Sequence, residues 1–277
     1  MECKVNGINV YYEEVGVGRP LLMLHGWGLD HNYIVHDMEP LFTGRTGWRR
    51  IYPDLPGMGK TPAADWLTTN DQMLAVILEF MDTIARGERF TIAGTSYGGY
   101  LARGVAYRKR TQLDGLLLNV ASVEIDENKR DLPTHQVLKE DADFLGALEP
   151  GEEWLRDLVV VQSLELLMEF RESVLPASTI ADQEFLTRLS ASRAFAFDAD
   201  PHPEKFPAPA LILTGRFDHW CGYRDAYRLL DDYPRATFAV LDRSGHALSH
   251  EQKTLFKALV SEWLDRVEEY VRQYKPE

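Results

Sequence analysis

Short apolar runs recur along the chain, and most of them end at glycine, proline or aspartate. The first two runs, residues 3–5 and 8–15, flank Asn6-Gly7, a dipeptide that favours the tight turn of a β-hairpin. The later runs are short and continuous, which is typical of strands buried on both faces. These strands are predicted within residues 20–26, 49–57, 89–96, 113–122, 209–215 and 236–242.

Amphipathic stretches lie between these runs. In residues 70–86 apolar side chains recur at helical spacing, and Asn70 is the expected N-cap of that helix. Residues 251–271 show the same spacing through Phe256, Val260, Trp263, Val267 and Val271. Alternating strands and helices predict an α/β fold, in which a mainly parallel, doubly wound sheet is covered by helices on both faces.

One long stretch interrupts this alternation. Residues 123–206 contain no convincing strand, are acidic, and show helical patterns over 152–170 and 182–197 before a proline-rich end. A proline-rich end is typical of a stiff linker back to the sheet. We therefore expect a core of residues 1–122 and 207–277, with residues 123–206 inserted as a helical cap over the carboxyl ends of the strands.

Composition and charge narrow the range of partners. The chain has 277 residues, is 45% hydrophobic and carries a formal net charge of −13. These values suit a globular protein and disfavour nucleic acid and anionic membranes as partners. Cys3 and Cys221 are too few for a disulfide framework and are compatible with a reducing compartment. With no secretory-signal pattern and no long apolar span, we expect a cytoplasmic protein that acts on a small molecule. The sequence leaves the oligomeric state open, a homodimer included.

The clearest chemical signal is the segment Gly94-Thr95-Ser96-Tyr97-Gly98. It follows a predicted strand and precedes a helical pattern, so the turn must be tight, and glycine on both sides of the serine avoids side-chain clashes. The pattern G-x-S-x-G in this setting is typical of a nucleophile elbow, which exposes the serine hydroxyl beside a helix N-terminus. Ser96 is therefore the predicted nucleophile.

A serine nucleophile needs a base, and the base needs a carboxylate to orient it. His246 follows the strand predicted at 236–242 by a short loop, and Asp218 lies just beyond the strand predicted at 209–215. Strand ends of this kind gather at one crevice in an open α/β sheet. The chain order Ser96, Asp218, His246 and these positions favour the three residues as a catalytic triad.

A glycine-containing loop after the first parallel strand predicts the remaining part of the site. The loop reads His25-Gly26-Trp27-Gly28, and its glycines let the backbone approach a substrate closely. We expect the backbone N–H groups of Trp27 and of Tyr97, the residue after the nucleophile, to stabilise an oxyanion. Further candidates for the substrate pocket are His25, Gly26, Gly28, Trp220 and Leu248.

Substrate recognition stays open from the sequence. Four aromatic residues of the cap segment suit a pocket wall and the cap interior equally well: Trp154, Phe170, Phe195 and Phe197. Cys221 suits a small buried filler better than a site residue. Three arginines are candidates for a charged contact, with nothing to choose among them: Arg103, Arg193 and Arg216.

The chain resembles the α/β-hydrolase superfamily, in the branch with a helical cap. The resemblance covers nearly the whole chain, although the cap matches only in position and helical character. It rests on HGWG at 25–28, YPDLPGMGKT at 52–61, GTSYGG at 94–99, GRFD at 215–218 and SGH at 244–246. It implies Ser96 as nucleophile, Asp218 as acid and His246 as base. It also implies an oxyanion hole formed by Tyr97 and Trp27, and no metal or organic cofactor.

The resemblance implies a serine hydrolase that cleaves a small ester or similar carbonyl compound through an acyl-enzyme. Hydrolases of C–C bonds in ring-cleavage products typically have tryptophan after the catalytic histidine, where this chain has Ala247. Proline iminopeptidases usually carry a G-G-S-W-G elbow, from which Thr95 and Tyr97 depart. Acyl transfer or perhydrolysis could use the same triad, and a non-catalytic receptor on this fold is a further alternative.

Two other motifs are discounted. The segment PGMGKT at 56–61 lacks the glycine at position 54 that a phosphate-binding P-loop needs, because Asp54 stands there. His246 and His250 have a spacing that can hold zinc, but no third ligand pattern accompanies them. We therefore expect neither a phosphate loop nor a metal.

Overall fold

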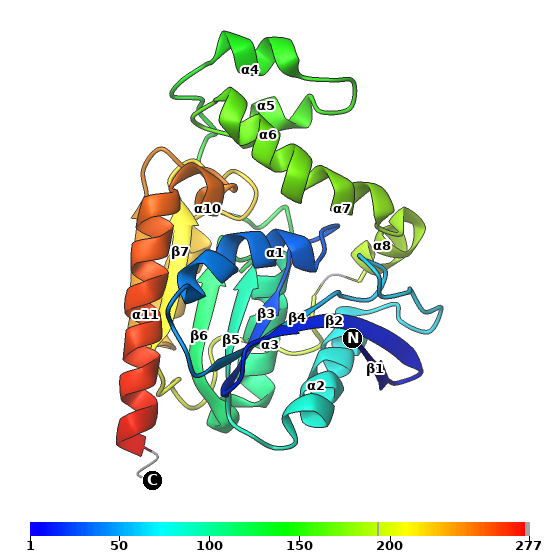
Figure 1. The fold of residues 1–277 in the computed structure, drawn as a ribbon, viewed down its shortest axis with the longest axis vertical. Coiled ribbons are helices and arrows are strands. Elements are labelled where there is room, and N and C mark those ends of the chain that lie inside the picture. The colour runs from blue at the N-terminus through cyan, green and yellow to red at the C-terminus, as the bar shows by residue number, and fades with distance from the viewer. Residues whose placement is uncertain (193, 275–277) are drawn as a thin grey trace.

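The computed structural model describes residues 1–192 and 194–274, and Figure 1 shows how their helices and strands are arranged. Eight strands form one sheet in the order β1-β2-β4-β3-β5-β6-β7-β8. Their bounds are β1 Glu2–Val5, β2 Ile8–Val15, β3 Arg19–Leu24, β4 Trp48–Pro53, β5 Phe90–Thr95, β6 Leu113–Asn119, β7 Ala210–Gly215 and β8 Ala236–Leu241.

The sheet is mainly parallel, as the sequence predicts. Only β1 with β2 and β2 with β4 pair antiparallel, and the other neighbours are parallel. The β1–β2 turn is the expected one, because Asn6 and Gly7 have φ angles of 47° and 82°. Both positive values belong to the turn type that Asn-Gly favours.

Helices cover both faces of the sheet. α2 (Asn70–Ala85) and α3 (Tyr97–Arg108) pack on one face, while α1 (His31–Met38) and α11 (Lys253–Tyr274) pack on the other. Successive side chains of β3 enter the two separate apolar cores, since Leu22 belongs to one and Leu21 to the other. The other helices outside the segment between β6 and β7 are short. Their bounds are η1 Glu39–Phe42, η2 Arg110–Gln112, α9 Arg224–Tyr227, η3 Arg228–Asp231 and α10 Leu248–Glu251.

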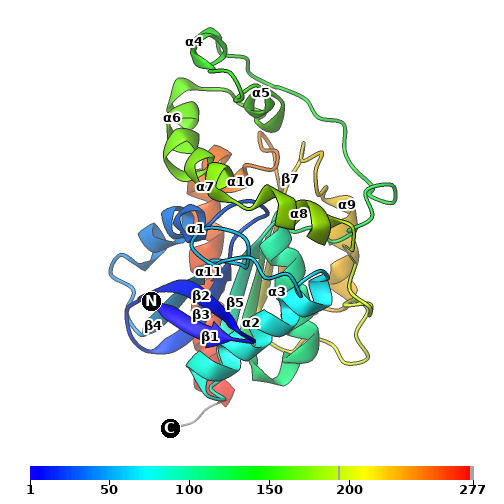
Figure 2. The same ribbon diagram turned by 90° about the vertical axis from the view of Figure 1, so that its right-hand side faces the viewer.

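The segment between β6 and β7 carries the remaining helices. They lie together above one end of the sheet in Figures 1 and 2. Their bounds are α4 Ala142–Ala147, α5 Trp154–Leu158, α6 Leu164–Ser173, α7 Leu175–Ile180 and α8 Gln183–Ser190. The only pairing of β type that is found between positions 123 and 206, residue 193 left aside, is an isolated bridge between Lys139 and Val161.

The structure corrects several local predictions. The helix expected over 152–170 is broken after α5, where Val159 turns extended and begins a run of three β-branched valines. The helix expected over 182–197 ends at Ser190. The N-cap of α2 is Thr69, not Asn70, because Thr69 and Gln72 form a reciprocal capping box.

The helix α1 was not expected from the sequence. Its buried side includes His31 and Asp37 beside Tyr33, Ile34 and Met38, so polar residues interrupt the apolar periodicity. Asp30 caps this helix by accepting a hydrogen bond from the Asn32 amide.

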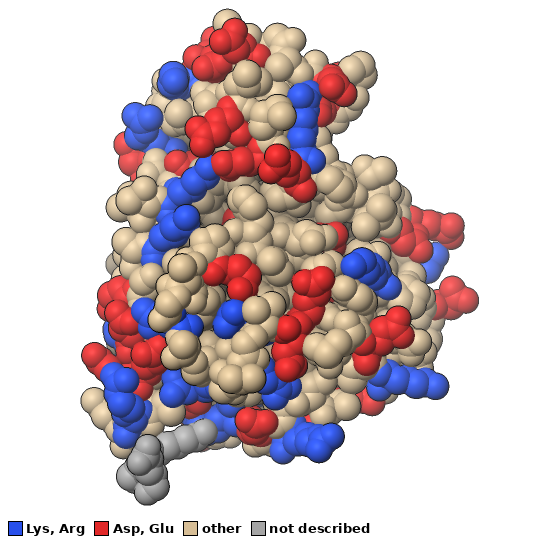
Figure 3. All heavy atoms as spheres, in the orientation of Figure 1, with Lys and Arg blue, Asp and Glu red and all other residues tan. Residues whose placement is uncertain are grey.

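Acidic and basic side chains are interspersed on the face of the molecule drawn in Figure 3. Among the described helices, none is long and apolar enough to cross a membrane.

Candidate active site

Ser96 lies at the tight turn between β5 and α3. Its backbone has φ 54° and ψ −115°, outside the regions that most residues adopt. The turn leaves no room for side chains at its flanks. A Cβ at Gly94 would lie 2.3 Å from the Gly98 carbonyl oxygen, and one at Gly98 would lie 2.2 Å from the Leu24 carbonyl oxygen. Both glycines are therefore required by close approach of the backbone.

His246 joins Ser96 to Asp218. Its Nε2 lies 3.0 Å from Ser96 Oγ, and its Nδ1 lies 3.0 Å from Asp218 Oδ2. The second carboxylate oxygen, Oδ1, accepts hydrogen bonds from the amides of Trp220 at 2.9 Å and Cys221 at 3.1 Å. The carboxylate is thus fixed on both oxygens, and the structure brings together the three residues that the sequence singles out.

Charge and burial oppose each other in this group. Burial by itself raises the pKa of Asp218, but the charge and hydrogen bond of His246 and the two backbone amides lower it overall. Burial disfavours the charged form of His246, but Asp218, followed by Cys221, raises its pKa well above the usual value. The site is therefore arranged to stabilise an imidazolium on His246.

The two expected oxyanion donors lie beside the nucleophile. The rings of Trp27 and Tyr97 meet edge to face, with centroids 4.9 Å apart. A Cβ at Gly26 would lie 3.6 Å from the Ser96 Cβ, so the loop after β3 runs against the elbow. Within the described ranges, no protein acceptor is recorded for the amide N–H of Trp27 or Tyr97. Neither amide is therefore committed to a backbone acceptor in the described part of the chain.

Ser96 opens into a cavity of about 740 Å³. Its wall includes Gly26, Gly28, Trp220 and His246, all of them residues that the sequence analysis selected for the site. The segment between β6 and β7 contributes the opposite wall, including Trp154, Leu158, Phe170, Val174, Ser178 and Leu186. The cavity therefore lies between the sheet and the helices α5–α8.

Comparison with known proteins identifies the family of this chain. The model of the alpha/beta hydrolase family matches residues 21–258. The chain belongs to this family.

The names of similar proteins include two kinds of activity. This chain is 27% identical to a 2-hydroxy-6-oxononadienedioate/2-hydroxy-6-oxononatrienedioate hydrolase of Burkholderia vietnamiensis, over 94% of this chain and 92% of that protein. It is 22% identical to a pimeloyl-[acyl-carrier protein] methyl ester esterase of Legionella pneumophila, over 93% of this chain and all of that protein. An alpha/beta superfamily hydrolase of Oenococcus oeni matches in structure with a TM-score of 0.86 and 27% identity, covering 97% and 99% of the two chains.

Two expected pocket residues of the hydrolase lie outside the cavity wall. His25 is fully buried, with Nδ1 2.8 Å from the Gly26 carbonyl oxygen and Nε2 accepting the Leu55 amide at 3.0 Å. Its ring connects the loop of residues 25–28 to the loop after β4. Leu248 is also fully buried and packs in the apolar core beneath α11. Ala247, its neighbour, lines the cavity in its place.

The residues whose role the sequence left open fall into two groups, those that line the cavity and those that lie elsewhere. Trp154 and Phe170 line the cavity, whereas Phe195 stacks on Tyr100 at 4.2 Å and on Phe197 at 5.0 Å, away from it. Arg103 is buried in an ion pair with Asp200, and Arg216 hydrogen-bonds Tyr223. Arg193 lies outside the described residues.

Cys221 and Asn70 belong to the site, although the sequence assigns them elsewhere. Cys221 lines the cavity, with its Sγ 3.2 Å from Ser122 Oγ. Asn70 also lines the cavity and accepts a hydrogen bond from the Tyr97 hydroxyl. Its helical spacing indicated only a cap, so the sequence carried no signal for this contact.

Glu251 links the loop of His246 to the extended segment that follows α5. Its Oε2 accepts the Gly245 amide at 2.7 Å, next to His246, while its Oε1 accepts the amides of Val160 at 2.5 Å and Val161 at 3.2 Å. Burial raises the pKa of Glu251, against the effect of these three amides. No motif marks this residue, because its partners are backbone groups far away in sequence.

Proposed function

We propose that the protein is a serine hydrolase that cleaves a small ester, or a similar carbonyl compound, through an acyl-enzyme. The observation that carries the proposal is the continuous chain of contacts from Ser96 Oγ through His246 to Asp218. An unassisted serine hydroxyl is a weak nucleophile, and an adjacent oriented base is the usual means of activating it.

The proposed reaction begins with attack of Ser96 Oγ on the carbonyl carbon while His246 Nε2 takes the hydroxyl proton. The carbonyl electron pair moves onto oxygen, and the amides of Trp27 and Tyr97 stabilise that charge. When the intermediate collapses, the bond to the leaving alcohol breaks and His246 gives the alcohol its proton. Water then attacks the acyl-enzyme with His246 again as base, and the carboxylic acid leaves as Ser96 recovers its proton.

Asp218 acts on the base in this scheme. Its hydrogen bond to Nδ1 presents Nε2 of His246 to the serine, and its charge stabilises the imidazolium formed at each proton transfer. The amides of Trp220 and Cys221 hold the carboxylate in place during this step.

We propose residues 123–206 as the cap that shapes the substrate site. This proposal is supported by the side chains of α5–α8, which line the same cavity as Ser96. Those residues include Trp154, Leu158, Phe170 and Val174, so the acyl or alcohol group they meet should be apolar. The two free cysteines, both buried, are consistent with a cytoplasmic location for such an enzyme.

Hydrolysis of a C–C bond is the second candidate. It is favoured by the 27% identity to the 2-hydroxy-6-oxononadienedioate/2-hydroxy-6-oxononatrienedioate hydrolase of Burkholderia vietnamiensis. Ala247, which lines the cavity beside His246, stands where such hydrolases typically have tryptophan. We therefore rank ester cleavage first.

A direct comparison of substrates tests the ranking. A series of p-nitrophenyl esters of increasing acyl length should be hydrolysed by the wild type, with kcat/KM above that for a 2-hydroxy-6-oxodienoate. Ser96→Ala should abolish both activities, whereas Ser261→Ala, on α11 away from the cavity, should retain them. Hydrolysis of the dienoate alone would reverse the ranking, and ester hydrolysis that survives Ser96→Ala would refute the proposed mechanism.

A further inference from the structure

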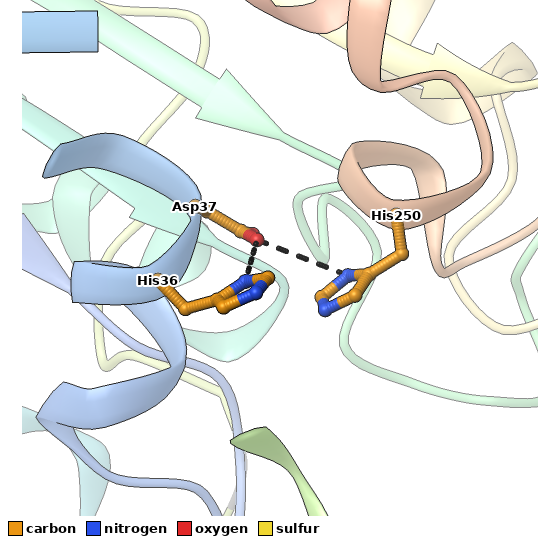
Figure 4. A group of neighbouring side chains, drawn as sticks. All are labelled: His36, Asp37 and His250. Carbon is orange, nitrogen blue, oxygen red and sulfur yellow. Dashed lines mark hydrogen bonds and ion pairs between the residues drawn. The ribbon is translucent and has the colours of Figure 1, made fainter. Parts of the chain in front are cut away.

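A second group of possible ligand side chains lies outside the catalytic triad. His36 and Asp37 come from α1, and His250 comes from α10, which follows the loop of His246. Each residue offers a ligand atom, and these atoms lie within 4.8 Å of one another. Figure 4 shows the three side chains close together between the two helices, with the two imidazole rings side by side.

Asp37 is a buried carboxylate without a short hydrogen bond. Its side chain is 5% exposed, and its Oδ1 lies 3.4 Å from His36 Nδ1 and 3.8 Å from His250 Nδ1. Its Oδ2 is buried and has no hydrogen-bond partner among the described residues. Charge-assisted hydrogen bonds usually measure about 2.7–2.9 Å, so this carboxylate is poorly compensated by the protein alone.

The His250 ring is closely packed by aromatic side chains, but its two nitrogens make only long hydrogen bonds. Its ring stacks against Tyr33 and lies against Phe170, with centroids 5.5 Å and 5.1 Å away. Its Nδ1 lies 3.4 Å from Ser249 Oγ and its Nε2 lies 3.5 Å from Ser173 Oγ, both at the outer limit for a hydrogen bond. The imidazole therefore has a nitrogen to offer to a stronger partner.

We propose that His36, Asp37 and His250 form a binding site for a divalent transition metal ion, with Zn²⁺ as the best match. Two imidazole nitrogens and one carboxylate oxygen form a donor set that suits zinc. Zinc bonds of about 2.0–2.1 Å in a tetrahedron place neighbouring ligand atoms about 3.4 Å apart. The separations of 3.4 Å and 3.8 Å around Asp37 Oδ1 are close to that value.

One side chain has to turn for the ion to bind. The rings of His36 and His250 are stacked at 9° with centroids 5.4 Å apart, so their in-plane lone pairs do not yet converge. His36 is 41% exposed and can rotate about its side-chain bonds, while His250 stays packed. Lys253, a neighbouring cation, is paired with Glu169. The open positions of the ion would take water.

Such an ion would join two helices directly behind the cavity wall. Tyr33 and Phe170 both line the cavity and also contact the His250 ring. Phe170 lies on α6, so an ion there would stiffen the contact between core and cap. This role concerns the stability of the wall and is independent of the chemistry proposed for Ser96.

The triad itself is the competing metal site. Ligand atoms of Asp218, Cys221 and His246 also lie within 4.8 Å of one another. Both oxygens of Asp218 already accept hydrogen bonds of 2.9–3.1 Å from Trp220, Cys221 and His246. Because those lone pairs are in use, the group around Asp37 should bind the ion more tightly.

Isothermal titration of Zn²⁺ into chelator-treated protein, purified without a histidine tag, tests the proposal. We expect one bound ion in the wild type, about tenfold or more weaker binding in His36→Ala and Asp37→Asn, and unchanged binding in His202→Ala and Cys221→Ala. Zn²⁺ should also raise the Tm of the wild type but not that of His36→Ala.

Two results would overturn the proposal. One is the absence of Zn²⁺ binding to folded wild-type protein. The other is binding that His36→Ala and Asp37→Asn leave unchanged and Cys221→Ala removes. Co²⁺ in place of Zn²⁺ gives a spectroscopic check, because thiolate charge-transfer absorption would assign the ion to Cys221, whereas ligand-field bands without it would assign it to the histidine group.

Discussion

Ser96 is held in a backbone conformation that an isolated chain would rarely adopt. Positive φ at a residue with a Cβ costs on the order of 1–3 kcal/mol and persists only where the surroundings enforce it. Here the Ser96 amide donates to the Asn119 carbonyl, and the Ser96 carbonyl accepts from Tyr100 and Ser122. These contacts orient the hydroxyl toward His246 before any substrate binds.

The carboxylate of the proposed triad, Asp218, gives the first prediction. Asp218→Asn should retain the fold, because the Asn oxygen can still accept the amides of Trp220 and Cys221. The amide cannot stabilise the imidazolium or enforce the same tautomer of His246, so kcat should fall by up to about 10⁴-fold. Ester kinetics of Asp218→Asn, with Asp242→Asn as an exposed control, measure this effect. Activity near that of the wild type would remove Asp218 from the triad.

The pH dependence of activity gives the second prediction. His246 must be neutral to accept the serine proton, so kcat/KM should fall as pH decreases through its pKa. Because Asp218 and Cys221 raise the pKa of His246, against the effect of burial, the midpoint should lie above about 6.5. The midpoint should move to lower pH in Asp218→Asn, and an unshifted midpoint would contradict the assigned pairing.

At the scale of elements, the elbow depends on close packing of β3, β5 and α3. Gly98→Ala would bring a methyl group against the Leu24 and His25 carbonyl oxygens, at 2.2 Å and 2.5 Å. We expect destabilisation of about 1–3 kcal/mol and loss of ester hydrolysis. Gly146→Ala, inside α4 with no atom within 4 Å of the new methyl, is the matched control and should keep or slightly raise Tm. Thermal unfolding followed by circular dichroism compares the two variants, and equal Tm values would show that the elbow tolerates the extra atom.

The link between the histidine loop and the cap gives a further prediction. Glu251→Gln replaces one carboxylate oxygen by an NH₂ group, which cannot accept the amides that Glu251 now binds. We expect faster hydrogen exchange at Val160, Val161 and Gly245, with kcat lowered more than KM is raised. Glu184→Gln, at an 87% exposed position on α8, is the control. Unchanged exchange at those three amides would refute a linking role.

The strands and the long helices α2 and α11 were predictable because each has a local signature in the sequence. The apolar runs located the strands of the sheet. The geometry of the β1–β2 turn follows from the positive φ angles of Asn6 and Gly7, and that of the elbow follows from close packing at Gly94 and Gly98. α1 escaped prediction because its buried face includes His31 and Asp37. The three valines at 159–161 are a local signal for the break after α5, whereas Glu251, which accepts the amides of Val160 and Val161, is a partner that no local pattern reveals.

For the molecule as a whole, the cap segment should control which substrates enter. Trp154 lines the cavity and stacks on Trp220, whose ring lies 5.0 Å from that of His246. Trp154→Ala should therefore enlarge the site and shift the preference among p-nitrophenyl esters toward longer acyl chains, by roughly tenfold in relative kcat/KM. Leu164→Ala, at a 43% exposed position on α6, should leave the preference unchanged. An unaltered preference in Trp154→Ala would argue against a pocket formed by the cap.

The meeting of Ser96, Asp218 and His246 was predictable from chain order and strand ends, whereas the far wall of the cavity was not. Ser96, Asp218 and His246 follow strands of one parallel sheet, so topology alone brings them together. Trp154 and Phe170 reach the cavity wall through the packing of short helices. Phe195 and Phe197 looked equally suitable from the sequence, but they stack on each other, and Phe195 also stacks on Tyr100. His25 turns inward to contact the backbone of Gly26 and Leu55, and Leu248, at the start of α10, packs into the apolar core.

The central claim is that Ser96 is an activated nucleophile, and covalent labelling tests it most directly. The folded protein is incubated with a fluorophosphonate probe, and the adduct is located by peptide mass spectrometry. The account predicts one adduct, on the peptide that contains Ser96, present in the wild type and in Ser261→Ala and absent from Ser96→Ala. An adduct on another serine, equal labelling of Ser96→Ala, or no labelling of the wild type would contradict it.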